Sequence, residues 1–362
     1  MTNIDGLKCV HYGDIYKNYT NKEVVSSSIL NSISLKFPKH KIIKQNAIII
    51  ADVSETLDDW GHVTFVRFDG TTFINGTHTF AIVSDCEVTL KYLFYFLRYN
   101  ANIKMLRQFL TGVTVFQMSI KSLSNYNIEL PPLKIQTRIA EILSAYDDAI
   151  ENNNRRIAIL EDTARELYRE WFVRFRFPGY EKAKFVNGLP EGWEIRKIKS
   201  IIKRLPFRNL YKENDVADRG SVIVIDQSKD ECLGFHDNEA DYAATSEKPI
   251  ILFGDHSCKM MYMTSSFSLG ENVIPFASNS EMPEAYLFAI IFGMIETIEY
   301  KRHWTELMSK KAVVAAEPLQ HCYANIVKPF YSQIETLRIK NRFLAHQRDL
   351  LIPRLMSGKL EV

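Results

Sequence analysis

Apolar residues near the middle of the chain follow a heptad pattern. They recur at alternating steps of four and three, while glutamate, aspartate, arginine and asparagine fill most of the intervening positions. This spacing puts one apolar stripe on a helix and is typical of a coiled coil. A helix over about 135–175 would be about 60 Å long. Its seam consists of Ile139, Leu143, Tyr146, Ile150, Asn153, Ile157, Leu160, Ala164, Leu167 and Trp171.

The C-terminal end of the chain repeats this pattern. A shift of 184 residues lays Phe330 on Tyr146 and Leu351 on Leu167, so both helices have the same heptad phase. A helix with a single apolar seam needs a partner, and we expect these two to pair with each other antiparallel. The second seam consists of Ile326, Phe330, Ile334, Leu337, Asn341, Leu344, Arg348, Leu351 and Leu355.

The segments before the two helices also look duplicated. "AIIIADVSE" from Ala47 parallels "PIILFGDHS" from Pro249, and each reads as a short strand that ends in a turn with an aspartate. "YLFYFLRYN" then parallels "YLFAIIFGM", "QMS" parallels "LMS", and "PPL" parallels "EPL", in the same order. The order predicts an α/β (α+β) fold with two similar mixed domains, two long helices as an antiparallel coiled coil, and a pseudo-two-fold internal repeat.

Breaks in these patterns define the expected domain boundaries. We predict a first α/β domain over 1–134, a long helix over 135–178, a second domain over 179–322 and a second long helix over 323–362. Pro178 and Gly179 end the first helix. The second domain opens with "LPEGWEIRKIKSI", for which the first domain has no counterpart before "HYGDIYKNY". We therefore expect the first domain to lack its opening strand.

Composition narrows the class of protein. The chain of 362 residues is 46% hydrophobic and 24% charged, as in ordinary globular proteins, and its net charge of +2 neither demands nor excludes a nucleic-acid partner. The apolar run from Tyr286 to Ile295 is about half the length that spans a bilayer. The N-terminus resembles no secretion signal, so we expect a cytoplasmic protein. The five cysteines show no CxxC spacing, which favours reduced thiols and argues against a metal site.

The sequence contains no recognisable catalytic motif. It has no Walker phosphate loop, GxGxxG, GxSxG or HExxH, and no Asn-Pro-Pro-Tyr box of amino-methyltransferases. His256 beside Asp255 fits a polar turn better than an acid-base pair. Asp241, Glu247 and Lys248 weakly resemble the residue pattern of a metal-dependent nuclease, but the preceding proline and the strand that such a site needs are missing. We expect no enzyme activity and no cofactor in this chain.

Three stretches together resemble a known family. "LPPLKIQTRIAEILSAYDDAIENNNRRIAILEDTARELYREWFVRFRFPG", "GLPEGWEIRKI" and "QRDLLIPRLMSGKLEV" are similar to the specificity subunits of type I restriction-modification systems. The resemblance covers the chain from Tyr12 onwards. It implies two target-recognition domains, each reading half of a split DNA sequence, with the helices setting the gap. It also implies two methyltransferase subunits that use S-adenosylmethionine, and restriction subunits that use ATP and Mg.

Residue chemistry suggests which loops read DNA. Side chains that donate or accept hydrogen bonds on loops are the usual readers of base edges. In the first domain we favour "LTGVTVFQ", and in the second "GDHSCK" and "EYKRHWTE". The candidates are Thr111, Gly112, Thr114 and Gln117, then more weakly Lys17, Arg67, His78 and Thr79, and in the second domain His256, Ser257, Lys259, Lys301, Arg302, His303 and Trp304.

Other interpretations of the helices stay open. A coiled-coil scaffold that binds partners but never DNA would show the same heptads, and a cryptic nuclease is a weaker alternative. The charged outer face, with Arg155, Arg156 and Glu161 among others, would suit methyltransferase subunits or simply solvent. Trp171 and Phe172 are expected to anchor the helix to the neighbouring domain. Asn153 and Asn341 occupy the same seam phase, where a buried amide can fix helix register.

Overall fold

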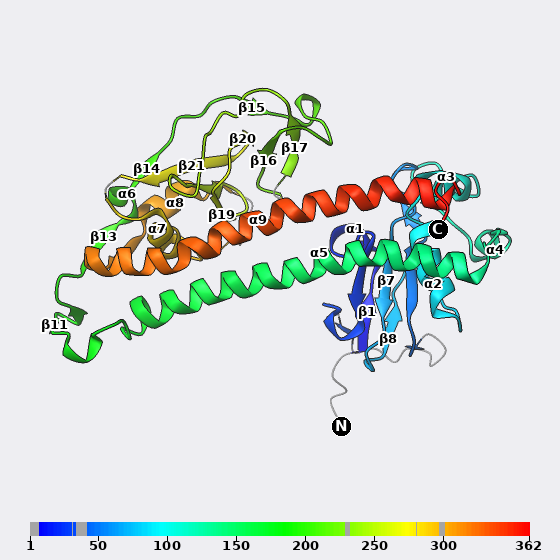
Figure 1. Cartoon of the computed structure of the whole chain (residues 1–362), viewed down its shortest axis with the longest axis horizontal. Helices are drawn as coiled ribbons and strands as arrows, with labels where there is room; N and C mark the ends of the chain where they lie inside the picture. Colours follow the sequence, from blue (N-terminus) through cyan, green and yellow to red (C-terminus); the bar gives the residue numbers. More distant parts are fainter. Residues whose placement is uncertain (1–6, 31, 34–41, 229–231, 280, 297–300) are drawn as a thin grey trace. The chain divides into compact units, whose positions relative to one another are not determined.

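The computed structural model describes residues 7–30, 32–33, 42–228, 232–279, 281–296 and 301–362 (Figure 1). The chain divides into two compact units. Unit 1 comprises residues 1–151 and 341–362, and unit 2 comprises residues 152–340. Each unit therefore contains one mixed α/β domain and a stretch of both long helices.

The two long helices are α5, Leu133–Tyr168, and α9, Glu317–Met356. They have 36 and 40 residues, and a π-helical turn, Arg169–Val173, continues α5. Helix α9 begins at 317, ahead of the predicted boundary at 323. Pro318 is tolerated in its first turn because the N–H groups there have no intrahelical partner.

The two helices run antiparallel within each unit. In unit 1, Ile139 and Leu143 of α5 share an apolar core with Ile352 and Leu355 of α9. In unit 2, the Tyr323 hydroxyl donates to the Ala164 carbonyl at 3.0 Å, and Arg338 donates to Glu161 at 3.2 Å. Thus the first part of α5 meets the last part of α9 in unit 1, and the last part of α5 meets the first part of α9 in unit 2.

The buried face of the helices follows most of the heptad seam. Every seam residue from Tyr146 to Leu167 and from Phe330 to Leu351 is buried or half-buried. The expectation for Ile326 is wrong, because its side chain is 40% exposed whereas that of Val327 is fully buried. The first half of α9 packs against the α/β domain of unit 2 as well as α5, so its buried face is turned away from the simple seam.

A four-stranded sheet lies at the centre of unit 1, with strand order β2-β7-β5-β9. A second sheet has the order β3-β1-β8-β4. The central strand β5 pairs antiparallel with both neighbours. The strands are β1 Leu7–Val10, β2 Lys22–Val25, β3 Ser32–Ile33, β4 Ile42–Ile43, β5 Ala47–Ala51, β6 Val53–Ser54, β7 Val63–Arg67, β8 Phe73–Asn75, β9 Thr79–Ile82 and β10 Phe116–Gln117, and the helices are α1 Tyr12–Lys17, α2 Glu87–Phe96, α3 Asn100–Arg107 and α4 Ile120–Ser124.

Unit 2 has two corresponding sheets, ordered β14-β21-β18-β19 and β15-β20-β16-β17. Two short pairs, β13-β22 and β11-β12, are added to them. The strands are β11 Phe185–Val186, β12 Leu189–Pro190, β13 Glu194–Lys197, β14 Ile202–Arg204, β15 Leu210–Tyr211, β16 Val222–Ile225, β17 Cys232–His236, β18 Ile250–Gly254, β19 Met260–Met263, β20 Phe267–Gly270, β21 Val273–Ser278 and β22 Lys311–Val314, and the helices are α6 Ile198–Ile201, α7 Glu284–Ile291 and α8 Trp304–Ser309.

The two units share one chain topology. In each, a central strand (β5 or β18) pairs antiparallel with the next strand of its sheet (β7 or β19) and with a later one (β9 or β21). The strand between them in sequence (β8 or β20) joins the second sheet and pairs parallel with an earlier strand. Helix α2 or α7 follows. This arrangement confirms the predicted fold class.

The starts of α5 and α9 share an equivalent side-chain hydrogen bond. The Gln136 amide donates to the Pro131 carbonyl at 2.7 Å, and the Gln320 amide donates to the Ala315 carbonyl at 2.7 Å. These glutamines are 184 residues apart, as the heptad shift requires. The sequence match of "PPL" with "EPL" is therefore two residues out of register.

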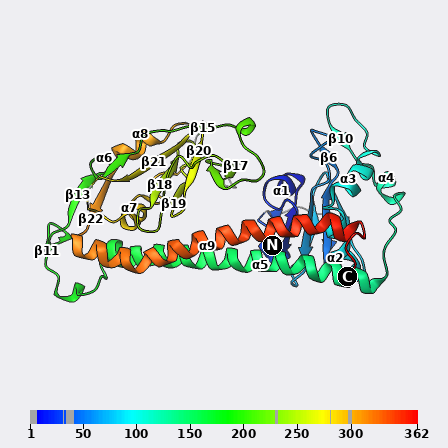
Figure 2. The ribbon, with the colours of Figure 1, turned by 45° about the horizontal axis from the view of Figure 1, so that its top comes forward.

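Unit 2 contains a segment that unit 1 lacks among its described residues. Strand β13 lies beside β22 (Figure 2) and pairs with it antiparallel. Helix α6 leads from β13 into β14, which pairs with β21. No strand in the described part of unit 1 takes the place of β13 or β14. The expectation that the first domain lacks its opening strand stays a prediction, because residues 1–6 lie outside the described part of the chain.

Two general expectations can be compared with the structure. Among the described residues, no helix combines the length and the apolar character that crossing a bilayer would require. No disulfide joins any of the five cysteines, all of which lie in the described part of the chain.

Candidate nucleic-acid interface

An aspartate at the end of the central strand organises equivalent loops in the two units. The Asp52 amide donates to the His78 carbonyl at 3.1 Å, and the Asp255 amide donates to the Asn272 carbonyl at 2.8 Å. His78 and Asn272 both have a left-handed backbone, with φ of 59° and 62°. Two loops at one end of each domain therefore have the same construction.

In each unit, a third loop is hydrogen-bonded to the aspartate at the end of the central strand. The Met118 amide donates to the Asp52 carbonyl at 2.8 Å, and the His303 amide donates to the Asp255 carbonyl at 2.8 Å. The structural counterpart of Met118 is thus His303, and the sequence match of "QMS" with "LMS" is wrong. Three loops meet at one end of each domain, and most of the predicted DNA-reading residues lie on them.

The third loop of unit 1 is a tight hairpin. Thr111 and Gln117 exchange backbone hydrogen bonds of 3.0 and 2.8 Å. Gly112 has φ of +119°, and a Cβ atom added there would lie 1.9 Å from the Val115 carbonyl oxygen, so only glycine fits. Val113 at the tip is 92% exposed. The hairpin therefore projects Thr114 and the surrounding backbone into solvent.

Below this hairpin, His78 and Gln117 surround a largely buried carboxylate. The His78 imidazole Nδ1 lies 3.6 Å from Asp52 Oδ1. Burial raises the pKa of Asp52, and the effect is opposed by the Gln117 side chain and by His78. The carboxylate therefore lies between side chains of the other two loops, and the His78 ring also packs edge-to-face against that of Tyr12.

The weaker candidates of unit 1 have different roles. Thr79 is buried, and its hydroxyl donates to the Gly76 carbonyl at 2.7 Å, so it supports the loop and cannot reach DNA. Arg67 is exposed but forms an ion pair with Glu23 at 3.4 Å. Lys17 is exposed at the end of α1.

In unit 2, the loop after β18 is held by neighbouring loops. The His256 amide donates to the Gln227 side chain at 2.9 Å, and His256 Nδ1 lies 3.1 Å from the Lys301 carbonyl oxygen. Lys259 Nζ donates to the Ser228 carbonyl at 2.8 Å. These contacts bring three predicted residues, His256, Lys259 and Lys301, to one end of the domain.

The segment 301–304 has an exposed half and a buried half. Arg302 has a 76% exposed side chain whose Nε lies 3.9 Å from Asp255 Oδ2, and the Lys301 side chain is 53% exposed. His303 is 1% exposed, so its assignment as a DNA contact is wrong. Asp255 Oδ1 accepts from the amides of His303 and Trp304 at 3.0 and 2.9 Å and thereby caps α8.

Sequence reading missed two residues of this site. Asn272 and Gln227 hold the loops of unit 2 but were not among the candidates. The signal for Asn272 was present, because Gly270, Glu271 and Asn272 separate two apolar runs and asparagine favours a left-handed turn. Nothing in the sequence marked Gln227, which meets His256 only through the fold.

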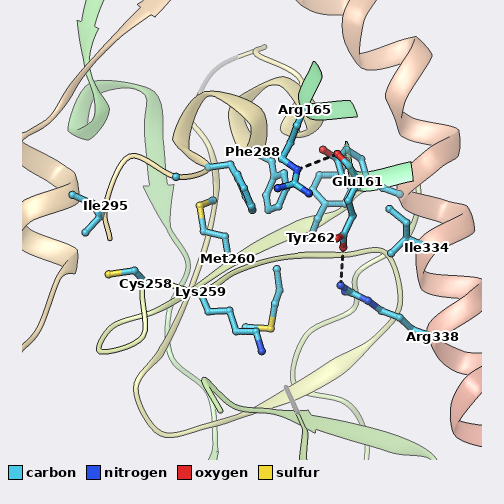
Figure 3. A pocket seen from close by; sticks show the side chains of 14 residues that line it. Glu161, Arg165, Cys258, Lys259, Met260, Tyr262, Phe288, Ile295, Ile334 and Arg338 are labelled. Carbon is cyan, nitrogen blue, oxygen red and sulfur yellow. Dashed lines mark hydrogen bonds and ion pairs between the residues drawn. The ribbon is translucent and has the colours of Figure 1, made fainter. Parts of the chain in front are cut away.

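A separate cavity of about 340 Å³ lies against the helices of unit 2 (Figure 3). Its walls include Tyr262, Phe288 and Tyr331, and Glu161 lies on its rim between Arg165 and Arg338. No three histidine, cysteine, aspartate or glutamate side chains gather to suit a metal ion anywhere in the part of the chain that the structure describes. The shared loop ends therefore remain the best candidate site.

Comparison with known proteins gives a consistent result. Residues 4–162 match a family described as the type I restriction modification DNA specificity domain. Two similar proteins come from Methanocaldococcus jannaschii. The type I restriction enzyme MjaIX specificity subunit is 25% identical over 315 residues, or 78% of this chain and 71% of that protein. The putative type I restriction enzyme MjaX specificity subunit is 32% identical over 299 residues, or 75% of this chain and 68% of that protein.

A solved structure supports the fold. The S subunit of a type I restriction-modification system from M. genitalium aligns with a TM-score of 0.55 at 14% identity, covering 98% of this chain and 91% of that one. The duplicated domains, the paired helices and the sequence relatives agree, and this chain belongs to the specificity subunits of type I restriction enzymes.

Proposed function

We propose that the three-loop ends of the two domains each read one half of a bipartite double-stranded DNA sequence. The repeated geometry carries this proposal: Asp52 with His78 and Asp255 with Asn272 build the same loop platform twice. Different side chains project from the two platforms, which suits two different half-sites. Exposed cations such as Arg302 would hold phosphates, and the hydrogen-bonding loops would reach base edges.

The long helices would set the distance between the half-sites. Helices α5 and α9 each contain residues of both units, so their lengths would determine how many base pairs lie unread between the half-sites. Register would depend on polar seam positions such as Asn153, which is 9% exposed.

Catalysis would come from partners. Specificity subunits lack activity of their own, and we infer that two methyltransferase subunits bring S-adenosylmethionine while restriction subunits bring ATP and Mg. The assembly would act in the cytoplasm. The charged outer face of α5, with Arg155 and Arg156, is the proposed contact for the methyltransferase subunits.

Selection from random DNA tests the proposal. The chain, alone or with its methyltransferase subunits, should enrich a split motif with a fixed gap. A single contiguous motif or no enrichment would contradict bipartite reading and favour a scaffold role. Cleavage of DNA by the chain alone with added metal would favour the nuclease alternative.

Charge reversal tests the loops of unit 2. Lys259→Glu with Arg302→Glu should weaken DNA binding at least tenfold and reduce the salt slope, log K against log salt, by about 2, because each lost phosphate contact contributes about 0.9. The matched control is Lys182→Glu with Lys184→Glu, two exposed lysines before β11. Equal losses of DNA affinity in both variants would show that binding depends on the net charge of the chain and not on these two positions.

A further inference from the structure

The cavity of about 340 Å³ in unit 2 is bounded by both long helices and by the α/β domain (Figure 3). Helix α5 contributes Glu161 and Arg165, and helix α9 contributes Tyr331 and Arg338. Strand β19, helix α7 and the segments next to them complete the wall. All residues that line the cavity belong to unit 2. A bound molecule would therefore touch both helices and the domain of one compact unit.

Aromatic rings form the inner wall of this cavity. The ring centroid of Tyr262 lies 4.4 Å from that of Tyr331 and 5.5 Å from that of Phe288. Phe292 lies 5.6 Å from Phe288 and is 42% exposed, so the row of rings runs from the core to the surface. Such a wall favours a flat ligand, because aromatic pairs prefer offset-stacked and edge-to-face contacts.

The size of the cavity limits the ligand. An apolar cavity of about 150 Å³ takes one benzene ring. The volume of about 340 Å³ therefore suits about two fused rings with one substituent. It lies at the small end of the range for pockets that bind small molecules, which begins at about 300 Å³.

Arg165 presents hydrogen-bond donors at the rim of the cavity. Its Nε donates to the Glu161 carbonyl at 3.3 Å, and its Nη2 pairs with the exposed Asp162. No residue in the described part of the chain accepts a hydrogen bond from its Nη1. Its Cζ lies 5.5 Å from the ring centroid of Phe292, which keeps the guanidinium beside the aromatic wall. Arg165 therefore offers the planar group that binds carboxylates and phosphates best.

The other charges of the wall favour an anion over a cation. Arg338 Nη2 lies 3.2 Å from Glu161 Oε1, so the single carboxylate of the wall already faces a cation. The Lys259 ammonium donates to the Ser228 carbonyl at 2.8 Å and faces a neighbouring loop. Aromatic walls also suit cations. Here the two guanidinium groups outnumber the one carboxylate, and the positive charge of Arg165 decides between the two ligands.

We propose that this cavity binds a planar aromatic anion. The flat part of the ligand lies against Tyr262, Phe288 and Tyr331, and its anionic group meets Arg165 at the rim. The ligand contacts α5, α9 and β19 together, so its binding stabilises their packing in unit 2. An aromatic carboxylate and a nucleoside monophosphate share this chemistry, and direct binding measurements distinguish the two sources.

Isothermal titration calorimetry of the full chain compares four probes. 2-Naphthoate should bind saturably at one site, about tenfold more tightly than neutral 2-naphthamide or cationic 2-naphthylmethylamine. Adenosine monophosphate is the fourth probe. Tighter binding of this nucleotide than of 2-naphthoate would assign the site to nucleotides, and weaker binding would assign it to aromatic acids. Absence of saturable binding of both anions, or equally tight binding of the amide or the amine, would overturn the proposal.

Two pairs of variants test the residues at the rim. Arg165→Gln should weaken 2-naphthoate binding about tenfold, because a charge and its N–H donors are lost. Arg169→Gln is the matched control, since Arg169 also pairs with a carboxylate three residues earlier but does not line the cavity. Phe292→Ala should weaken binding as well. Phe207→Ala removes another exposed ring that packs with an arginine in unit 2, and it should bind like the unaltered chain.

Glu161→Gln should have the opposite effect and tighten 2-naphthoate binding about fivefold, because a repelling charge leaves the rim. A purely structural role of Glu161 would instead leave the affinity unchanged or lower it, which would count against an anionic ligand. Circular dichroism of each variant shows whether it folds.

Hydrogen exchange locates the site on the chain. 2-Naphthoate should slow the exchange of amides in β19 of unit 2 and leave β5 of unit 1 unchanged. Equal protection of the two strands, or none in β19, would overturn the cavity as the binding site. DNA selection is a separate measurement, so failure here leaves bipartite reading intact.

Discussion

The two units hold the same pair of helices by different chemistry. In unit 1, Arg98 lies 3.0 Å from Asp147 of α5, which also pairs with Arg348 of α9 and accepts a hydrogen bond from Tyr95 at 2.7 Å. In unit 2, the helices are held by tilted and edge-on aromatic rings. Phe172 lies 4.8 Å from Tyr286 and 5.4 Å from Tyr323, measured between ring centroids.

Because of this difference, we expect single substitutions to lower the stability of the two units by different amounts. Burial alone would raise the pKa of Asp147, but Arg98 and Arg348 hold it below its usual value. A buried ion network depends on every member, because the loss of one leaves a charge without compensation. An aromatic cluster loses stability by degrees as contacts are removed.

Removal of the central carboxylate should have the largest effect. Asp147→Ala leaves Arg98, whose side chain is 5% exposed, without its nearest anion, and should lower the free energy of unfolding of unit 1 by about 3–5 kcal/mol. Denaturant unfolding followed by hydrogen exchange in each unit measures it. The control Glu161→Ala breaks a half-exposed pair with Arg338 and should cost less than about 1 kcal/mol. Equal losses in the free energy of unfolding would show that the buried ion pairs stabilise the protein no more than the half-exposed pair does.

A buried carboxyl group should make unit 2 sensitive to pH. Burial raises the pKa of Glu284 to about 7, opposed by a hydrogen bond from the Ser278 amide. Between pH 4.5 and 7 the folded state keeps this proton while the unfolded chain releases it, so stability falls as pH rises through that range. Because burial is incomplete, the loss should be about 2 kcal/mol.

Glu284→Gln should abolish this part of the pH dependence. The amide oxygen still accepts from Ser278, and no charge is buried. Thermal unfolding at pH 5 and pH 8 compares the two proteins. An unchanged difference between the two pH values would assign the effect to another group.

A milder change in the aromatic cluster should cost less. Phe172→Leu keeps an apolar side chain but removes ring contacts with Tyr286 and Tyr323, for a loss of about 1 kcal/mol in unit 2. Phe343→Leu, on an α9 position that is 64% exposed, serves as the control and should change stability by less than about 0.5 kcal/mol. The burial of Phe172 and Trp171 in the unit 2 core confirms their predicted role as anchors. A loss of more than about 3 kcal/mol in the free energy of unfolding would show that the aromatic cluster depends on single members as strongly as the ion network does.

The smallest effect on stability is expected at the hairpin tip of unit 1. Gly112→Ala forces the loop to rearrange, since its Cβ atom would meet the Val115 carbonyl, but the hairpin is exposed and should lose less than about 1 kcal/mol. Selection of DNA should nevertheless lose the half-site read by unit 1 and keep the other. Gly70→Ala has a similar φ of +103° with no atom within 4 Å and controls for backbone strain. Loss of both half-sites would argue against independent reading.

Much of the fold was accessible from the sequence because it is periodic. The heptads that place Leu160 on the seam of one helix and Leu337 on the seam of the other are local features, and their repetition at 184 residues predicted the pairing of the helices. The duplicated aspartates, Asp52 and Asp255, also marked the ends of equivalent strands. The family resemblance rested on the same stretches.

The sequence could not decide what depends on contacts between distant segments. Thr79 and His303 have suitable chemistry for DNA, yet both are buried because three loops close over them. Val327 replaces Ile326 on the buried face because α9 also packs on a sheet that the heptads do not report.

Thus the sequence by itself determined the periodic framework, since a helix face is fixed by spacing along one segment. Only the tertiary structure decided which loop residues face solvent and which, such as Thr79 and His303, are buried. Burial is a property of all the segments that meet at a point. Those segments lie up to hundreds of residues apart, and no local pattern encodes their meeting.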